Sequence, residues 1–125
     1  MTITASVAQI TAQPTQNGSR NYLVPGNVTA SSPTGGIINI TSDLTGIALI
    51  NVGTLDNAAS LALQGSLNGS SFYPVLIGGV AKTWTGTQIN AGVIESLNLK
   101  VTNIRFVLTP GTTTGSNGVQ PRVLD

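Results

Sequence analysis

The chain has 125 residues, of which 40% are hydrophobic and only 7% are charged, and its formal net charge is +1. It contains no cysteine and no histidine, which excludes disulfides, thiolate metal sites, Ser-His-Asp triads and imidazole proton shuttles. Five scattered basic residues give no electrostatic footprint for nucleic acid, and no apolar run reaches the length of a membrane-spanning helix. We therefore expect one domain without nucleic-acid or membrane partners.

The first 19 residues predict an extended arm or an edge strand. Ile3, Ala5 and Val7 alternate loosely with polar residues, and the loop-like sequence QPTQNGS follows at residues 13–19. Residues 20–125 are the predicted β-sandwich domain. The candidate interface residues are the apolar residues of the arm, with two aromatic residues of the domain: Ile3, Val7, Ile10, Tyr22 and Trp84.

Neutral polar residues replace the missing charges, with 17 Thr, 11 Ser and 11 Asn in the chain. Threonine favours strands, whereas asparagine, serine and glycine favour turns, so this composition predicts an all-β protein with many short loops. A chain with so little net charge also tolerates dense association. The alternative is an ordinary domain that hydroxyls and amides alone keep in solution.

Several short strands are predicted after the arm, in residues 20–24, 27–31, 37–40, 46–52 and 61–64. The segment at 46–52, GIALINV, is apolar at both parities. Such a strand is predicted to be central in its sheet and covered on both faces.

A hairpin is predicted around Asn68-Gly69, because this pair supplies the two positive φ angles of a two-residue type I′ turn. Its returning strand at 72–77 contains Pro74. Proline lacks the N–H that a central ladder needs, so this strand is expected at an edge or with a bulge. Gly78 and Gly79 are expected in a loop or bulge.

Strands are also predicted at 82–87, 88–94, 97–101, 104–108 and 119–124. The apolar parity switches from odd to even across Asn103, so a bulge or a corner must absorb one residue there. Many short strands separated by turn signals, with no helix of three turns, predict a single β-sandwich, and we favour a jelly roll.

No constellation of residues predicts catalysis, cofactor binding or a metal site. The four carboxylates are Asp43, Asp56, Glu95 and Asp125, and nothing in the sequence places any two of them together. Asp43 and Asp56 stand among turn residues, where aspartate commonly bonds its own backbone. We therefore predict that the chain is not an enzyme.

Trp84, flanked by threonines, has three interpretations. Its ring could pack in the core, anchor a protein interface or stack on a sugar. Phe106, between Ile104 and Leu108, is predicted to be a core residue.

Two segments resemble parts of the small β-sandwich virion proteins of tailed bacteriophages. The sequence LALQGSLNGSSFYPV at 61–75 resembles their hairpin, with Asn-Gly where Asp-Gly is commoner, and IRFVLT at 104–109 resembles the strand that follows it. The resemblance covers about residues 36–125. Discoidin-like and carbohydrate-binding sandwiches use a similar hairpin.

The resemblance implies a capsid decoration (cement) protein that binds the outside of a phage head, stabilises it and acts as a homotrimer without catalytic residues. Its partners would be the major capsid protein or other virion subunits. It would sit on the virion surface after assembly in the bacterial cytoplasm, where the absence of cysteine is in keeping with reducing conditions. The alternatives are a tail, neck or fibre component, and a module that binds carbohydrate or a cell surface.

Overall fold

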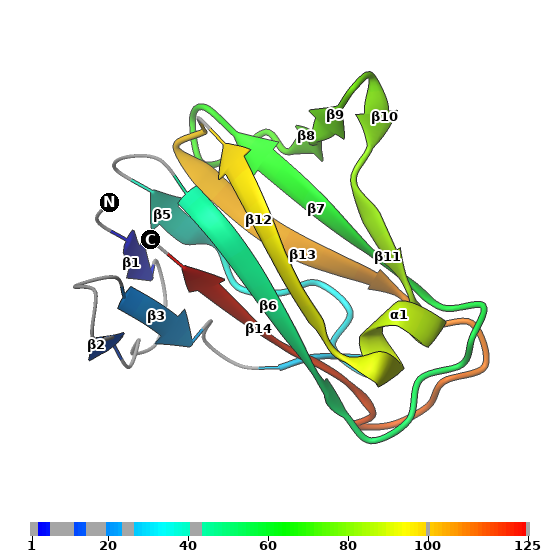
Figure 1. Cartoon of the computed structure of the whole chain (residues 1–125). Coiled ribbons are helices and arrows are strands. Elements are labelled where there is room, and N and C mark those ends of the chain that lie inside the picture. The colour runs from blue at the N-terminus through cyan, green and yellow to red at the C-terminus, as the bar shows by residue number, and fades with distance from the viewer. Residues whose placement is uncertain are drawn as a thin grey trace.

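The fold is all-β, as the composition predicts, and its two larger sheets lie face to face in a sandwich (Figure 1). This computed structural model describes residues 3–5, 12–14, 20–23, 27–40, 44–99 and 101–124, with side chains for 27–40, 45–99 and 101–124. Neighbouring strands within each sheet pair antiparallel.

The first sheet has the order β1-β5-β13-β7-β11, and β8 pairs with β7 beside β11. Its strands are β1 (Ile3–Ala5), β5 (Ile38–Ile40), β13 (Asn103–Thr109), β7 (Ser60–Ser66), β11 (Thr83–Thr85) and β8 (Tyr73–Pro74).

The second sheet has the order β12-β6-β14-β3-β2, and β4 pairs with β14. Its strands are β12 (Val93–Leu99), β6 (Leu44–Val52), β14 (Gly118–Leu124), β3 (Arg20–Leu23), β2 (Ala12–Pro14) and β4 (Val28–Thr29). A separate two-stranded hairpin contains β9 (Leu76–Ile77) and β10 (Val80–Ala81). The helix α1 (Gly86–Ala91) joins β11 to β12.

The core lies between the two sheets and follows the period of two that strands impose. In β13 the buried residues Ile104, Phe106 and Leu108 alternate with half-buried or exposed ones. From the opposite sheet, Ile47 and Leu49 of β6 join the same cluster of buried side chains. Each such side chain contributes about 1.5–3 kcal/mol when it is fully buried, so this cluster holds the sheets together.

The parity switch across Asn103 marks a corner, as predicted. Leu97 and Leu99 are buried from β12 in the second sheet, whereas Ile104 and Phe106 are buried from β13 in the first. The chain crosses from the second sheet to the first between the end of β12 at Leu99 and the start of β13 at Asn103, and this crossing changes which parity faces the core.

The prediction for residues 46–52 is only half right. β6 is central, because it pairs with β12 on one side and β14 on the other. Its outer face is not covered, however, since Ile50 is exposed and Val52 is only partly buried. Apolar residues at both parities therefore mark an apolar outer surface here rather than a second covering layer.

The hairpin around Asn68-Gly69 forms, but the predicted two-residue turn is wrong. β7 and β8 are joined by residues 67–72, and the pairing closes at Gly65 opposite Tyr73. The Asn68 side chain organises this loop by accepting hydrogen bonds from the Ser70 and Ser71 backbone N–H groups, both at 2.9 Å. A side chain that can bond the following backbone in this way favours a longer turn.

The two-residue hairpin lies instead at Gly78-Gly79, between β9 and β10. Both glycines have positive φ, 62° and 81°, as a type I′ turn requires, and Ile77 pairs directly with Val80 across it. Pro74 occupies the short strand β8, which pairs with β7 at its open side, so its expected place at an edge is confirmed.

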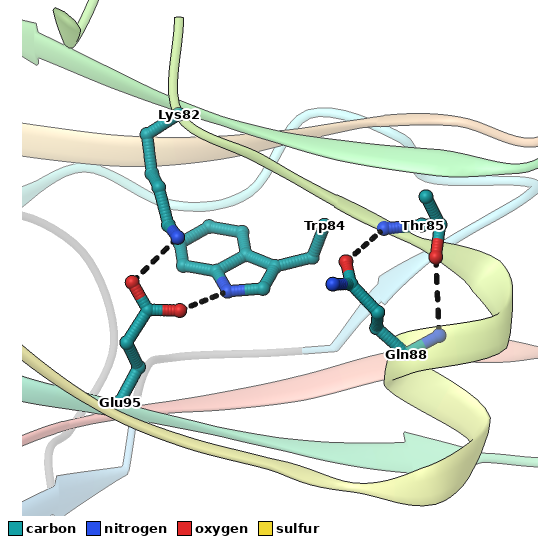
Figure 2. Close-up of polar contacts among 5 residues, drawn as sticks. All are labelled: Lys82, Trp84, Thr85, Gln88 and Glu95. Carbon is teal, nitrogen blue, oxygen red and sulfur yellow. Dashed lines mark hydrogen bonds and ion pairs between the residues drawn. The ribbon is translucent and has the colours of Figure 1, made fainter. Parts of the chain in front are cut away.

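The predicted strand at 88–94 is wrong in its first half, where α1 forms. Thr85 caps this helix: its hydroxyl accepts from the Gln88 N–H, and the Gln88 side chain accepts from the Thr85 N–H (Figure 2). This reciprocal capping box has the sequence signature Thr-x-x-Gln. Within the described part of the chain, no helix has the length and apolar character needed to cross a membrane.

The N-terminal segments pair with both sheets. β1 pairs with β5, Ile3 opposite Ile40, and β2 pairs with β3. Residues 6–11 and 15–19 lie outside the described residues. The arm over 1–19, the domain boundary at residue 20 and the jelly-roll connection stay predictions.

Candidate interaction surface

The Asp56 carboxylate is part of a turn, as the sequence predicts. It accepts hydrogen bonds from the backbone N–H groups of Thr112, at 3.0 Å, and Ala58, at 3.3 Å. These bonds, that from Thr112 first, hold the pKa of the Asp56 carboxyl below its ordinary value, because they favour the charged form. The carboxylate thereby ties the loop after β6 to the loop after β13.

We expect acid to weaken the fold through Asp56. Because its pKa is lower in the folded state, its contribution is fully present above the ordinary carboxyl pKa of about 3.9 and is lost as the pH falls through the folded-state value. Urea unfolding between pH 6 and pH 2 measures this loss. Asp56→Asn should remove part of the acid dependence, and an unchanged dependence in that variant would contradict this role.

Trp84 lies in the core, so core packing is the interpretation that the structure shows. Its side chain is only 2% exposed, and its ring centroid lies 6.2 Å from that of Phe106. The indole N–H donates to Glu95 Oε1 at 3.1 Å, while Glu95 Oε2 lies 2.5 Å from Lys82 Nζ (Figure 2). Glu95 therefore satisfies a buried donor and balances a neighbouring cation.

We expect Glu95→Ala to lower the free energy of unfolding by about 1–3 kcal/mol, because the buried indole N–H loses its acceptor. Glu95→Gln keeps a carbonyl acceptor and loses only a partly exposed ion pair, so it should cost about 0–1 kcal/mol. Urea unfolding followed by the emission of the single tryptophan compares the two. Equal losses would show that the hydrogen bond contributes nothing.

In the described part of the chain, no group of three or more carboxylates forms a candidate metal site. The side chains of Asp43 and Asp125 lie outside the described residues. Asp56 and Glu95 have the structural partners described above. These contacts give both carboxylates structural roles. The candidate binding sites are therefore the exposed side chains and grooves of the surface.

The β9–β10 hairpin presents large apolar side chains to solvent. Leu76, Ile77 and Val80 are between 43% and 68% exposed. Because cross-strand partners share a face, Ile77 and Val80 lie on one face of the hairpin, and Leu76 and Ala81 lie on the other. Figure 1 shows the hairpin projecting away from the two sheets. An apolar cluster of this kind on a soluble domain is typical of an interaction site.

The hairpin leaves the sheet at a fixed point. Leu63, buried in β7, accepts from the Val75 N–H at 3.1 Å, and its own N–H donates to the Lys82 carbonyl at 3.1 Å. The Lys82 N–H in turn donates to the Val75 carbonyl at 2.8 Å. Three backbones thus meet in a closed ring of hydrogen bonds, which anchors the base of the hairpin to a core strand.

A groove of about 530 Å³ adjoins the hairpin at this end of the sandwich. Residues from β7, the 67–72 loop and β8 line one side, and residues from the end of β12 and the corner line the other. Tyr73 is 67% exposed within it. The groove is therefore built from both sheets.

A second hollow, of about 610 Å³, lies on the outer face of the second sheet. Ile94 of β12 is 86% exposed, pairs with Ala48 of β6 and lines this hollow together with the exposed Ile50. Arg122 of β14 pairs with Ala48 from the other side and also lines the hollow. A charged residue therefore borders this hollow, whereas the exposed side chains of the hairpin are apolar.

The five predicted interface residues are not brought together by any described contact. Val7 and Ile10 lie outside the described residues, and Ile3 and Tyr22 are placed only as backbone positions in β1 and β3. Trp84 is buried.

The exposed residues of the hairpin and the groove are not among the interface residues predicted from the sequence. The available signal was LIGGVA at 76–81, in which apolar pairs flank a Gly-Gly turn and are too short to form core strands. No model of a known protein family matches the sequence, and no curated protein matches it.

Proposed function

We propose that this chain is a non-enzymatic structural subunit of a phage virion, which decorates the outside of the head and stabilises it. The observation that carries the proposal is the projecting apolar hairpin, with Leu76, Ile77 and Val80 exposed on a rigidly anchored base. Such a hairpin can insert between subunits of a lattice without undergoing any chemical change. The partner is the major capsid protein.

Two further features support this proposal. The segments that resemble phage virion proteins, at 61–75 and 104–109, fall on adjacent strands, since β7 pairs with β13 along its whole length. The low charge of the chain also makes contacts with neighbouring subunits less sensitive to salt. A homotrimer would suit the threefold positions of a capsid lattice, because a closed ring repeats the same contact three times.

Particles that lack the protein test this function. We expect the purified chain to co-sediment saturably with heads prepared without it and to raise the temperature at which they break open. Binding to tails but not to heads would favour the alternative of a tail, neck or fibre component. Failure to bind either structure would contradict a virion role.

Light scattering behind a sizing column tests the trimer separately. We expect a mass of three times 12.7 kDa, either for the free protein or for the protein released from heads under mild conditions. A monomer in both preparations would contradict the trimer and leave the head-binding result unaffected.

A further inference from the structure

The groove beside the hairpin has an apolar floor and a neutral polar rim. Leu99 is buried in its floor, and Val75 and Val101 pack partly against the core. Gly65 belongs to this floor as well, since a Cβ there would lie 3.2 Å from both valine side chains. Because Gly65 has no side chain, the groove stays open opposite Tyr73, the cross-strand partner of Gly65.

The rim carries four neutral polar groups that are free to bind. The Asn98 amide, the Asn68 Nδ2 group, the Ser71 hydroxyl and the Tyr73 hydroxyl all line the groove and have no partner within the described part of the chain. Asn98 lies within a register shift of β12, between Ser96 and Leu99. Irregularities of this kind commonly re-aim side chains at sites.

The 67–72 loop holds its side of the rim in place. Asn68 Oδ1 accepts from the Ser70 and Ser71 N–H groups, and the Ser66 hydroxyl accepts from the Gly69 N–H at 2.9 Å. These bonds use the carbonyl oxygen of Asn68 and leave its NH₂ group as a donor. A preorganised rim loses little entropy when a ligand binds.

We propose that this groove binds a neutral oligosaccharide. A sugar ring has faces of C–H groups, which stack on an exposed aromatic ring such as Tyr73, and a rim of hydroxyls, which pair with amide and hydroxyl groups. The volume of about 530 Å³ lies within the roughly 300–1,000 Å³ of small-ligand sites. No charged residue is among the described residues that line it, which favours a neutral ligand over an acidic sugar or a nucleic acid.

This site meets the proposed attachment surface only at Leu76, which lines the groove. The other two exposed hairpin residues, Ile77 and Val80, do not line it, and Tyr73 and Asn98 are not among the attachment residues. A failure of sugar binding therefore leaves the virion proposal unchanged, and the reverse also holds.

An NMR titration of the full chain tests the site with cellohexaose, chitohexaose and maltohexaose, and with hexagalacturonate as the acidic comparison. We expect at least one neutral hexamer to shift the side-chain NH₂ signals of Asn68 and Asn98. Tyr73→Ala should weaken this binding by about tenfold or more, because it removes the ring. Asn98→Ala should weaken it as well, whereas Ile94→Ala, on the outer face of the second sheet, should leave it unchanged.

Four results would overturn the proposal. They are no shift with any neutral hexamer at about 10 mM, roughly ten times the Kd of a weak complex; binding of the acidic hexamer alone; shifts confined to residues away from the groove; or wild-type affinity in both the Tyr73 and the Asn98 variant. Both side chains are exposed, so thermal unfolding of each variant should match the wild type and confirm that a loss of binding is local.

Discussion

Trp84→Ala is expected to lower the free energy of unfolding by about 3–5 kcal/mol, a large part of the roughly 5–15 kcal/mol that stabilises a typical domain. The ring is 2% exposed, packs 6.2 Å from Phe106 between centroids, and donates its N–H to Glu95. Its removal leaves a cavity, an unused acceptor and a weakened link between β11 and β12. Urea unfolding followed by circular dichroism measures the loss, because the variant has no tryptophan emission.

Trp84→Phe is the matched control. It keeps an aromatic ring beside Phe106 and loses the N–H and part of the volume, so its loss should be clearly smaller than that of Trp84→Ala. A loss below about 1 kcal/mol for Trp84→Ala is less than core truncations cost and would contradict core packing. The alternative of an interface role for Trp84 would then return.

Replacing the three exposed hairpin residues with serine should abolish stable attachment to heads. Each of Leu76, Ile77 and Val80 contributes about 1.5–3 kcal/mol when fully buried, so the triple variant should lose at least about a hundredfold in affinity. Co-sedimentation with heads at graded protein concentrations measures this change.

Ile94→Ser is the control for the hairpin variant. It removes one large side chain, which is even more exposed than those of the hairpin, from the outer face of β12, and should leave attachment within about threefold of the wild type. These three side chains are exposed and do not belong to the buried core cluster, so the triple variant should unfold close to the wild-type temperature. Wild-type attachment of a folded triple variant would contradict the role of the hairpin.

The sequence predicted those parts of the fold in which apolar and polar residues alternate over a whole strand. Ile104, Phe106 and Leu108 mark β13 over seven residues, and the parity switch across Asn103 predicted the corner that precedes this strand. Asp56 was predicted in a turn because aspartate commonly accepts from the backbone N–H two residues on, as it does here from Ala58. Its bond from the Thr112 N–H, 56 residues away, could not be predicted from the local sequence. Local patterns therefore sufficed where local chemistry decides.

Short elements escaped the same analysis. β9 and β10 have two residues each, and α1 has six. None of these three elements is long enough to show a period in its apolar residues. The capping-box signature of α1 was present at Thr85 and Gln88. Ile89 and Asn90, which follow it, are poor helix formers, so the segment did not resemble a helix.

The candidate sites could not be predicted because they join distant segments. The groove combines residues that lie between Gly65 and Leu76 with Asn98, Leu99 and Val101. The position of Trp84 depends on its contacts with Phe106 and Glu95. In β6, apolar residues at both parities were compatible with a covered or an open outer face. Only the arrangement of the sheets decides that Ile50 faces solvent.

Hydrogen–deuterium exchange on decorated heads tests the central claim most directly. The amides of residues 76–81 should exchange more slowly in the attached protein than in the free protein, because the hairpin is buried against capsid subunits. The amides of β14, which lies between β6 and β3 inside the second sheet, should serve as an internal reference. Unchanged exchange at the hairpin of the attached protein, with protection elsewhere, would contradict the account.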